Sequence, residues 1–126
     1  MDMLLDTHAF LWWDASDPQL GAACAAVIAD PANRIFVSAA SIWEIAIKQR
    51  AGRLHFTGSR SGAVTRNGFL HLPISCEHAE AAAALPPIHQ DPFDRILIAQ
   101  ALQRGLVLAT ADITIKQYSV PQLSAR

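Results

Sequence analysis

The sequence is short of cysteine and of long hydrophobic runs, and each shortage excludes a class of protein. Cys24 and Cys76 are too few and too far apart for a zinc site or a disulfide framework, so we expect reduced, buried thiols. No apolar run is long enough to cross a bilayer, and no basic leader follows Met1-Asp2. We therefore expect a cytoplasmic protein without membrane association.

Basic residues are also scarce. Ten lysines and arginines against eleven acidic residues give a formal net charge of −1. This excludes the overall positive charge that many nucleic-acid-binding proteins carry, so any such binding must depend on local charge. What the chain does have is apolar side chains, which make up 52% of its 126 residues. This is enough to bury one core, and we expect a single domain over residues 1–126.

Short apolar runs alternate with helical patterns along the chain. Strands are expected at residues 3–6, 35–37, 69–72 and 106–110, with an edge strand within 119–123. Helices are expected at residues 8–13, 18–29, 39–51, 57–68, 75–85, 92–104 and 113–118. Such alternation predicts parallel βαβ units. The expected fold is α/β, a three-layer α/β/α sandwich with a central parallel sheet of four to five strands.

The stretch from His89 to Ala101 places a charge where a core helix should carry none. Asp91 is a good N-cap and Pro92 suits the first helical position. At a helical period, Asp94 lies on the same face as the apolar residues that follow it. An acid in the first turn also suits the helix dipole and can close a capping box. A carboxylate carried toward a core must nevertheless be paired, hydrogen-bonded or neutralised.

Four acidic side chains are expected at one edge of the sheet. Asp6 and Asp112 follow strands directly, and Glu44 and Asp94 lie early in helices that begin near the same edge. Each has a simpler explanation alone, because Asp6 and Asp112 could cap the turns that follow and Glu44 could pair with Lys48. Together they would repel one another without a cation. Oxygen ligands without a cysteine and histidine set favour Mg²⁺ or Mn²⁺.

A basic segment accompanies these acids. Residues 45–76 contain no acid but hold Lys48, Arg50, Arg53, Arg60 and Arg66. Ordinary solvation of a polar face and contact with a phosphate backbone both explain such a block. A metal-binding acidic pocket beside it suggests that metal-activated water attacks a phosphodiester.

Four segments carry the acids, and together they resemble a known family. They are Leu4-Leu-Asp6-Thr-His, Ser38-Ala-Ala-Ser-Ile-Trp-Glu44-Ile-Ala-Ile-Lys48, His89-Gln-Asp-Pro-Phe-Asp94-Arg-Ile-Leu-Ile-Ala-Gln-Ala101 and Leu108-Ala-Thr-Ala-Asp112. These segments closely resemble the four motifs of PIN-domain ribonucleases, most of all the VapC-type toxins of bacterial toxin–antitoxin pairs. The resemblance spans nearly the whole chain.

The resemblance implies a site, an activity and partners. The site would be an acidic quartet of Asp6, Glu44, Asp94 and Asp112 around one or two Mg²⁺ ions, with Thr7 and Thr110 as supporting hydroxyls. The activity would be that of a hydrolase, a metal-dependent endoribonuclease that cleaves RNA. The partners would be a second copy in a homodimer and a small cognate antitoxin protein that blocks the pocket.

Roles can be assigned within this hypothesis. We expect Asp6 and Asp94 to hold the principal ion directly, while Glu44 and Asp112 act through waters or a second ion. RNA contacts are expected from Lys48, Arg50, Arg53 and Arg95. Arg95 follows Asp94 on the polar side of its helix, where it could orient a neighbouring acid, meet a phosphate or form a plain surface ion pair.

Two rival interpretations remain open from the residues. A phosphoacceptor receiver domain is also a parallel α/β sandwich with clustered acids, but it needs a lysine beyond a late strand, and Lys116 is expected on a helix. A non-catalytic interaction module could keep the acids for folding alone. Metal titration of thermal stability discriminates here, because a site formed only in the folded chain raises the melting temperature when it binds a metal.

Overall fold

The computed structural model describes residues 1–126, and a five-stranded parallel sheet forms its centre. The strand order is β3-β2-β1-β4-β5, and every neighbouring pair is parallel. The strands are β1 (Asp2–Leu5), β2 (Arg34–Ser38), β3 (Leu70–Leu72), β4 (Val107–Thr110) and β5 (Gln122–Ser124). The expected α/β class with four to five parallel strands is therefore confirmed.

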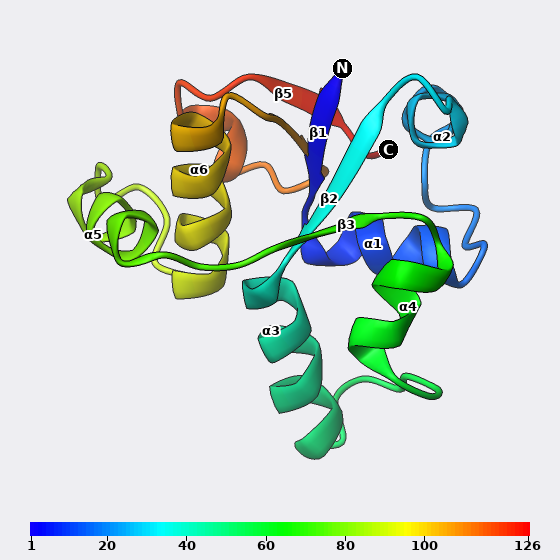
Figure 1. Ribbon diagram of the computed structural model, residues 1–126. Helices are drawn as coiled ribbons and strands as arrows, with labels where there is room; N and C mark the ends of the chain where they lie inside the picture. Colours follow the sequence, from blue (N-terminus) through cyan, green and yellow to red (C-terminus); the bar gives the residue numbers. More distant parts are fainter.

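Helices cover both faces of the sheet (Figure 1). They are α1 (Thr7–Asp14), α2 (Ala22–Ala29), α3 (Ala39–Arg50), α4 (Arg60–Arg66), α5 (Cys76–Ala84), α6 (Pro92–Arg104) and the 3₁₀ helix η1 (Ile115–Gln117). Side chains alternate along β1, so Met3 and Leu5 pack in the cluster that includes residues of α1, α2 and α4, while Leu4 packs in the cluster of α6 and η1. This burial on both faces explains why β1 is continuously apolar after Asp2.

The helix that carries Asp94 begins and ends as its sequence predicts. The Asp91 side chain accepts hydrogen bonds from the backbone N–H groups of Phe93 (2.8 Å) and Asp94 (3.3 Å), and Pro92 occupies the first helical position. Gly105 ends the helix in the left-handed conformation that glycine adopts readily (φ 63°). The N-cap and the terminating glycine therefore determine where α6 begins and ends. They also put Asp94 in the first turn of this helix.

Three expectations differ from the structure. The helix expected from residue 18 begins only at Ala22, because the Asp17 side chain accepts from the N–H of Gln19 and closes a turn there. The last helix is a single 3₁₀ turn. Cys24 is buried as expected, whereas Cys76 is exposed because it opens the solvent-facing helix α5. No helix has the length and apolar character that crossing a membrane requires.

The topology also fixes where a site can form. The chain leaves β1 for β2 on one side, and β4 pairs with the other side of β1. Strand order thus changes direction at β1, and in open parallel sheets the crevice outside the carboxyl ends of such strands is the usual binding place. Asp6 lies directly beyond β1, and Asp112 lies two residues beyond β4.

The candidate active site

A polar cavity of about 320 Å³ opens at these carboxyl ends. Only two of its twelve lining residues are hydrophobic. The lining consists of Asp6, Thr7, His8, Trp12, Glu44, Lys48, His89, Asp91, Asp94, Ala111, Asp112 and Arg126. The four acids expected from the sequence to share a site therefore do line one cavity, although they come from four separate elements of the chain.

Asp6 is both a helix cap and a member of this cavity. Its Oδ1 accepts from the backbone N–H of Ala9 at 2.8 Å, which begins α1. The residue is almost fully buried, and burial raises the pKa of its carboxyl above the ordinary value, against the opposing effects of the Ala9 hydrogen bond and the Thr110 hydroxyl. The capping role uses one oxygen, so the second oxygen remains for another ligand.

Glu44 is held by two side chains. Its Oε1 accepts from the Thr7 hydroxyl at 2.6 Å, and its Oε2 lies 2.8 Å from Lys48 Nζ, one helical turn further along α3. Only 5% of the Glu44 side chain is exposed, against 28% for Lys48. The pairing with Lys48 that the sequence allowed is thus present, and it lies inside the cavity rather than on the outer surface.

As in Asp6, one carboxylate oxygen of Asp112 caps a turn and the other is left for the cavity. Its Oδ1 accepts from the N–H groups of Thr114 (2.7 Å) and Ile115 (3.1 Å), which fixes the turn before η1. Its own N–H donates to the Thr110 hydroxyl at 3.0 Å. Oδ2 is left facing the cavity, so capping and site membership again use different atoms.

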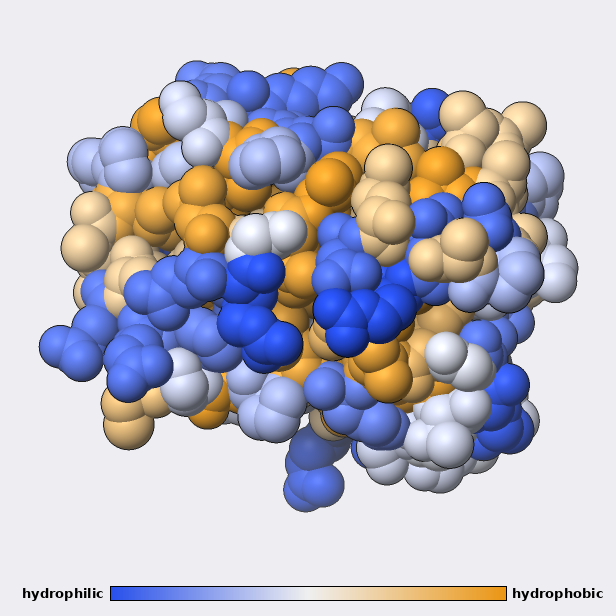
Figure 2. Space-filling model, turned by 45° about the horizontal axis from the view of Figure 1, so that its top comes forward, coloured by the Kyte–Doolittle hydropathy of each residue, from blue (hydrophilic) through white to orange (hydrophobic).

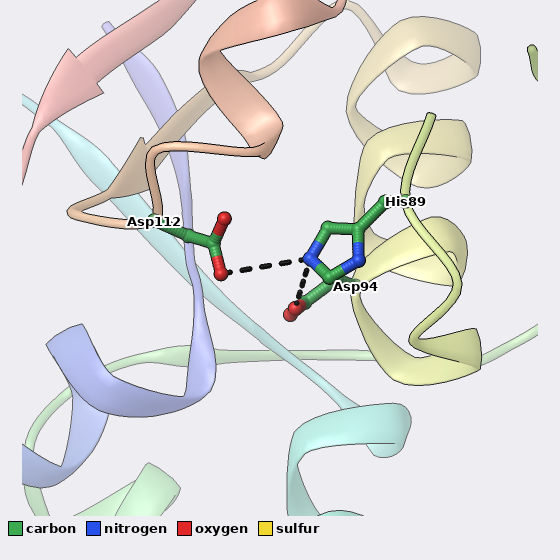
Figure 3. Close-up of side chains that lie close together, drawn as sticks. All are labelled: His89, Asp94 and Asp112. Atoms are coloured by element: carbon green, nitrogen blue, oxygen red, sulfur yellow. Dashed lines mark ion pairs between the residues drawn. The ribbon is translucent and has the colours of Figure 1, made fainter. Parts of the chain in front are cut away.

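His89 completes the arrangement (Figure 3). Its imidazole lies between two carboxylates, with Nε2 2.9 Å from Asp94 Oδ2 and 3.5 Å from Asp112 Oδ2. The Asp91 N–H donates to Nδ1 at 3.2 Å, so the hydrogen of the neutral ring is on Nε2. Nε2 is buried yet makes no well-directed hydrogen bond. This nitrogen lies between the carboxylates of Asp94 and Asp112, whose negative charges a bound cation would neutralise.

The pKa of Asp94 shows how unfavourable its negative charge is in this cavity. Burial, followed by the charge of Asp91, raises the pKa of its carboxyl to about 7, although His89 acts in the opposite direction. The side-chain atoms of His89, Asp94 and Asp112 offer ligand atoms within 4.8 Å of one another. Carboxylate oxygens with remaining lone pairs are the ligand type that Mg²⁺ and Mn²⁺ prefer, so the two carboxylates of this group fit a divalent ion.

The structure gives Arg95 a different role from those expected. Its guanidinium donates to the backbone carbonyls of Ala82 (2.7 Å), Leu85 (2.9 Å), Pro86 (3.0 Å) and His89 (3.1 Å), and it pairs with no acid. The backbone turns back on itself between α5 and α6, so carbonyls converge around this one side chain. Arg95 therefore fastens the segment that leads to His89 and does not line the cavity.

Tyr118 reinforces the same segment from η1. Its hydroxyl donates to the Pro86 carbonyl at 2.7 Å and accepts from the His89 N–H at 2.7 Å. Together with the Arg95 contacts, these bonds hold the backbone of His89 on two sides. The imidazole is therefore aimed into the cavity by residues that do not themselves reach it.

Other basic residues are distributed unevenly. Lys48 lines the cavity, whereas Arg50 and Arg53 do not and are exposed, at the end of α3 and in the following turn. Thr110 is buried, and its hydroxyl accepts a hydrogen bond from the N–H of Asp112. From the sequence alone, His89 stands only at the start of a motif and has no predicted role. The sequence feature that could have identified it is its position just before a helix that begins with proline.

Comparison with known proteins agrees with this geometry. A family model of the PIN domain matches residues 3–121. Ribonuclease VapC22 of Mycobacterium tuberculosis (strain ATCC 25618 / H37Rv) is 28% identical over 129 residues, which cover 95% of this chain and 94% of that protein.

Solved structures of similar fold include two bacterial assemblies. A toxin–antitoxin complex from Klebsiella pneumoniae matches with a TM-score of 0.68 and 20% identity, covering 98% of both chains. VapBC2 from Rickettsia felis, bound to a DNA fragment from its promoter, matches with a TM-score of 0.66 and 13% identity, also covering 98% of both chains. At such identities the structures support the fold alone, but the family match spans nearly the whole sequence. The chain belongs to the PIN domain family.

Proposed function

We propose that this chain is a divalent-metal-dependent endoribonuclease that acts as the toxin of a toxin–antitoxin pair. The observation that carries the proposal is the convergence of Asp6, Glu44, Asp94 and Asp112 on one cavity. The similar protein from M. tuberculosis is named a ribonuclease, and similar folds occur in toxin–antitoxin complexes. These names support the same activity and the same kind of partner for this chain.

Each acid has a role in the proposal. Asp6 and Asp94 hold a Mg²⁺ or Mn²⁺ ion directly, and Glu44 and Asp112 complete its surroundings through waters or a further cation. When bound, the ion supplies a more acidic water and stabilisation of the negative charge that develops on the phosphate. Thr7 orients Glu44, and Thr110 orients Asp112 and lowers the pKa of Asp6.

In the proposal, the basic residues Lys48, Arg50 and Arg53 bind the substrate. Lys48 lies within the cavity, and the exposed Arg50 and Arg53 follow Lys48 closely in the sequence. In the proposal these three side chains neutralise phosphates of the RNA, which makes binding depend on salt concentration. Arg95 is not included, because its donors are occupied by backbone carbonyls.

Two partners belong to the proposal. A small antitoxin protein would cover the cavity, and two copies of this chain would form a homodimer. Light scattering of the purified chain would then give twice its mass of 13.6 kDa. Expression of the chain without an antitoxin would slow the growth of a bacterial host.

Substitution of the acids tests the activity. Asp6→Asn and Asp94→Asn keep the shape of the side chain but remove its charge, and each should lower Mg²⁺-dependent cleavage of a labelled RNA about 100-fold or more. Asp2→Asn is the matched control, because Asp2 lies at the other end of β1, and it should cleave like the wild type. Circular dichroism verifies that all three variants fold. Full activity in both site variants would refute the proposal.

A further inference from the structure

A lysine ammonium group lies inside the acidic cavity. Lys48 extends from α3 and places Nζ 2.8 Å from Glu44 Oε2, with 28% of its side chain exposed. An exposed helix pair of this spacing would be ordinary. Here the glutamate is almost fully buried, so the lysine provides a positive charge at a fixed position within the cavity.

The carboxylate oxygens fall into two groups. Both oxygens of Glu44 have a partner, because Thr7 donates to Oε1 and Lys48 pairs with Oε2. Elsewhere in the cavity, Oδ2 of Asp94 and Oδ2 of Asp112 lie near no donor except Nε2 of the imidazole between them (Figure 3). The oxygens that can hold an ion therefore belong to the three aspartates, Asp6 included, and not to Glu44.

We propose that the Lys48 ammonium takes the place of a second metal ion, so that the cavity binds a single divalent cation. This inference rests on the proposed nuclease function and specifies the cation content of that same site. A second dication beside Nζ would meet a positive charge at short range in a partly buried setting, where charges are weakly screened. Glu44 would also have to give up a bonded partner to receive it.

The same position allows Lys48 to contact the substrate. An ammonium has three hydrogens, and Glu44 uses one of them. The other hydrogens are available to a non-bridging oxygen of the phosphate, where a compact positive charge stabilises the charge that develops during cleavage. Lys48 is then a catalytic residue, and Glu44 and Thr7 are the positioning residues that hold it.

Counting metal ions gives the first test. The full chain is titrated with Mn²⁺ alone, without RNA, and free Mn²⁺ is followed by electron paramagnetic resonance. We expect one tightly bound Mn²⁺ per chain. Two tightly bound ions per wild-type chain would overturn the inference, whatever the activity.

Substitution gives the second test. Lys48→Met should bind Mn²⁺ at least as tightly as the wild type, because a positive charge has been removed, and should cleave RNA about 100-fold more slowly. Arg104→Met is the matched control, since it removes an exposed positive charge ten residues along α6 from Asp94, and it should leave both measurements unchanged. Lys48→Arg restores charge but not shape and should recover part of the rate.

Two results in the variants would contradict the inference. Cleavage by Lys48→Met within a few-fold of Arg104→Met would show that the charge is dispensable. Loss of Mn²⁺ binding together with cleavage would show that Lys48 only maintains the metal site. If Lys48→Met does not fold, the ion count of the wild type decides alone. A wild-type chain without any metal-dependent cleavage refutes the proposed function instead, which keeps the two failures distinct.

Discussion

Strand β1 has an aspartate at each end, and the two differ in almost every physical respect. Asp2 is partly exposed, and both of its oxygens accept from the guanidinium of Arg34, its register partner on β2. This pairing holds the pKa of Asp2 below its ordinary value, whereas burial raises the pKa of Asp6. One residue type on one strand thus serves as an ordinary surface ion pair and as a candidate ligand.

The difference lies in what each carboxylate lacks. Asp2 has a cation of its own and water around it, so it needs nothing further. Asp6, Asp94 and Asp112 share a cavity whose side-chain cations are few, and each keeps an oxygen that no backbone group uses. On the face of the molecule in Figure 2, hydrophilic groups lie among hydrophobic surface. Unmet charge, rather than acidity itself, distinguishes the site.

The largest expected effect is on pH dependence without metal. The pKa of Asp94 in the folded chain is about 7, above the ordinary value of 3.8 for an aspartate, so protonation stabilises the fold. This stabilisation is complete below the unfolded value and is lost as pH rises through the folded one, a change on the order of 4 kcal/mol. Urea unfolding of the chelator-treated wild type should show this loss, and Asp94→Asn should not.

The Asp2→Asn variant is the control in the same urea experiment, because the pKa of Asp2 is shifted in the opposite direction from that of Asp94. Because the pKa of Asp2 is lowered, its stabilising effect is present above the unfolded value and is lost only as pH falls through the folded value. The Asp2→Asn variant should therefore follow the wild type from about pH 5 upward. Parallel curves for wild type and Asp94→Asn would contradict the assignment of the raised pKa.

A bound divalent ion should increase the free energy of unfolding, because it neutralises the buried carboxylates. Mg²⁺ or Mn²⁺ at a hundredfold excess over its dissociation constant should stabilise the wild type by about 2.7 kcal/mol, because binding to the folded chain alone shifts unfolding by mass action. Thermal unfolding with and without metal measures this. Asp94→Asn should lose most of the shift, while Asp2→Asn should retain it. An unchanged melting temperature in the wild type would favour a non-catalytic module.

A smaller effect is expected from the hydroxyl that orients Glu44. Thr7→Val removes the 2.6 Å hydrogen bond and leaves a buried carboxylate oxygen without its donor. The cost should be about 2 kcal/mol in the free energy of unfolding. The exposed Thr65→Val provides a control, and chemical denaturation compares the two. Equal stability of both variants would mean that water replaces the Thr7 hydroxyl.

The smallest effect belongs to the exposed pair. Asp2→Asn at neutral pH and moderate salt should leave the melting temperature within experimental error, since exposed ion pairs contribute little. Differential scanning fluorimetry is sufficient to check this. A loss as large as that from Thr7→Val would remove the contrast between the two ends of β1.

The sequence was sufficient to predict the fold class and the shared cavity. Asp91, Pro92 and Gly105 delimit α6 by local chemistry, and the alternation of apolar runs with helices predicts a parallel sheet. Since parallel strands end at one edge, four acids near strand ends predict one cavity without any knowledge of distances. The metal and the individual roles of the acids stay predictions.

Other features depend on contacts between distant segments, which local patterns do not encode. Arg95 looks like a surface residue on a helical wheel, yet carbonyls of the preceding turn converge on it. His89 has no sequence neighbour that indicates its position between Asp94 and Asp112. The late beginning of α2 depends on a turn closed by Asp17 that competes with helix formation. Tertiary structure decides each of these cases.

The contacts of Arg95 connect the backbone of His89 to α5, a helix outside the cavity. α5 contributes no side chain to the cavity, yet its last carbonyls share one guanidinium with the carbonyl of His89. A displacement of the end of α5 would therefore be transmitted through Arg95 to the backbone of His89, whose imidazole faces Asp94 and Asp112.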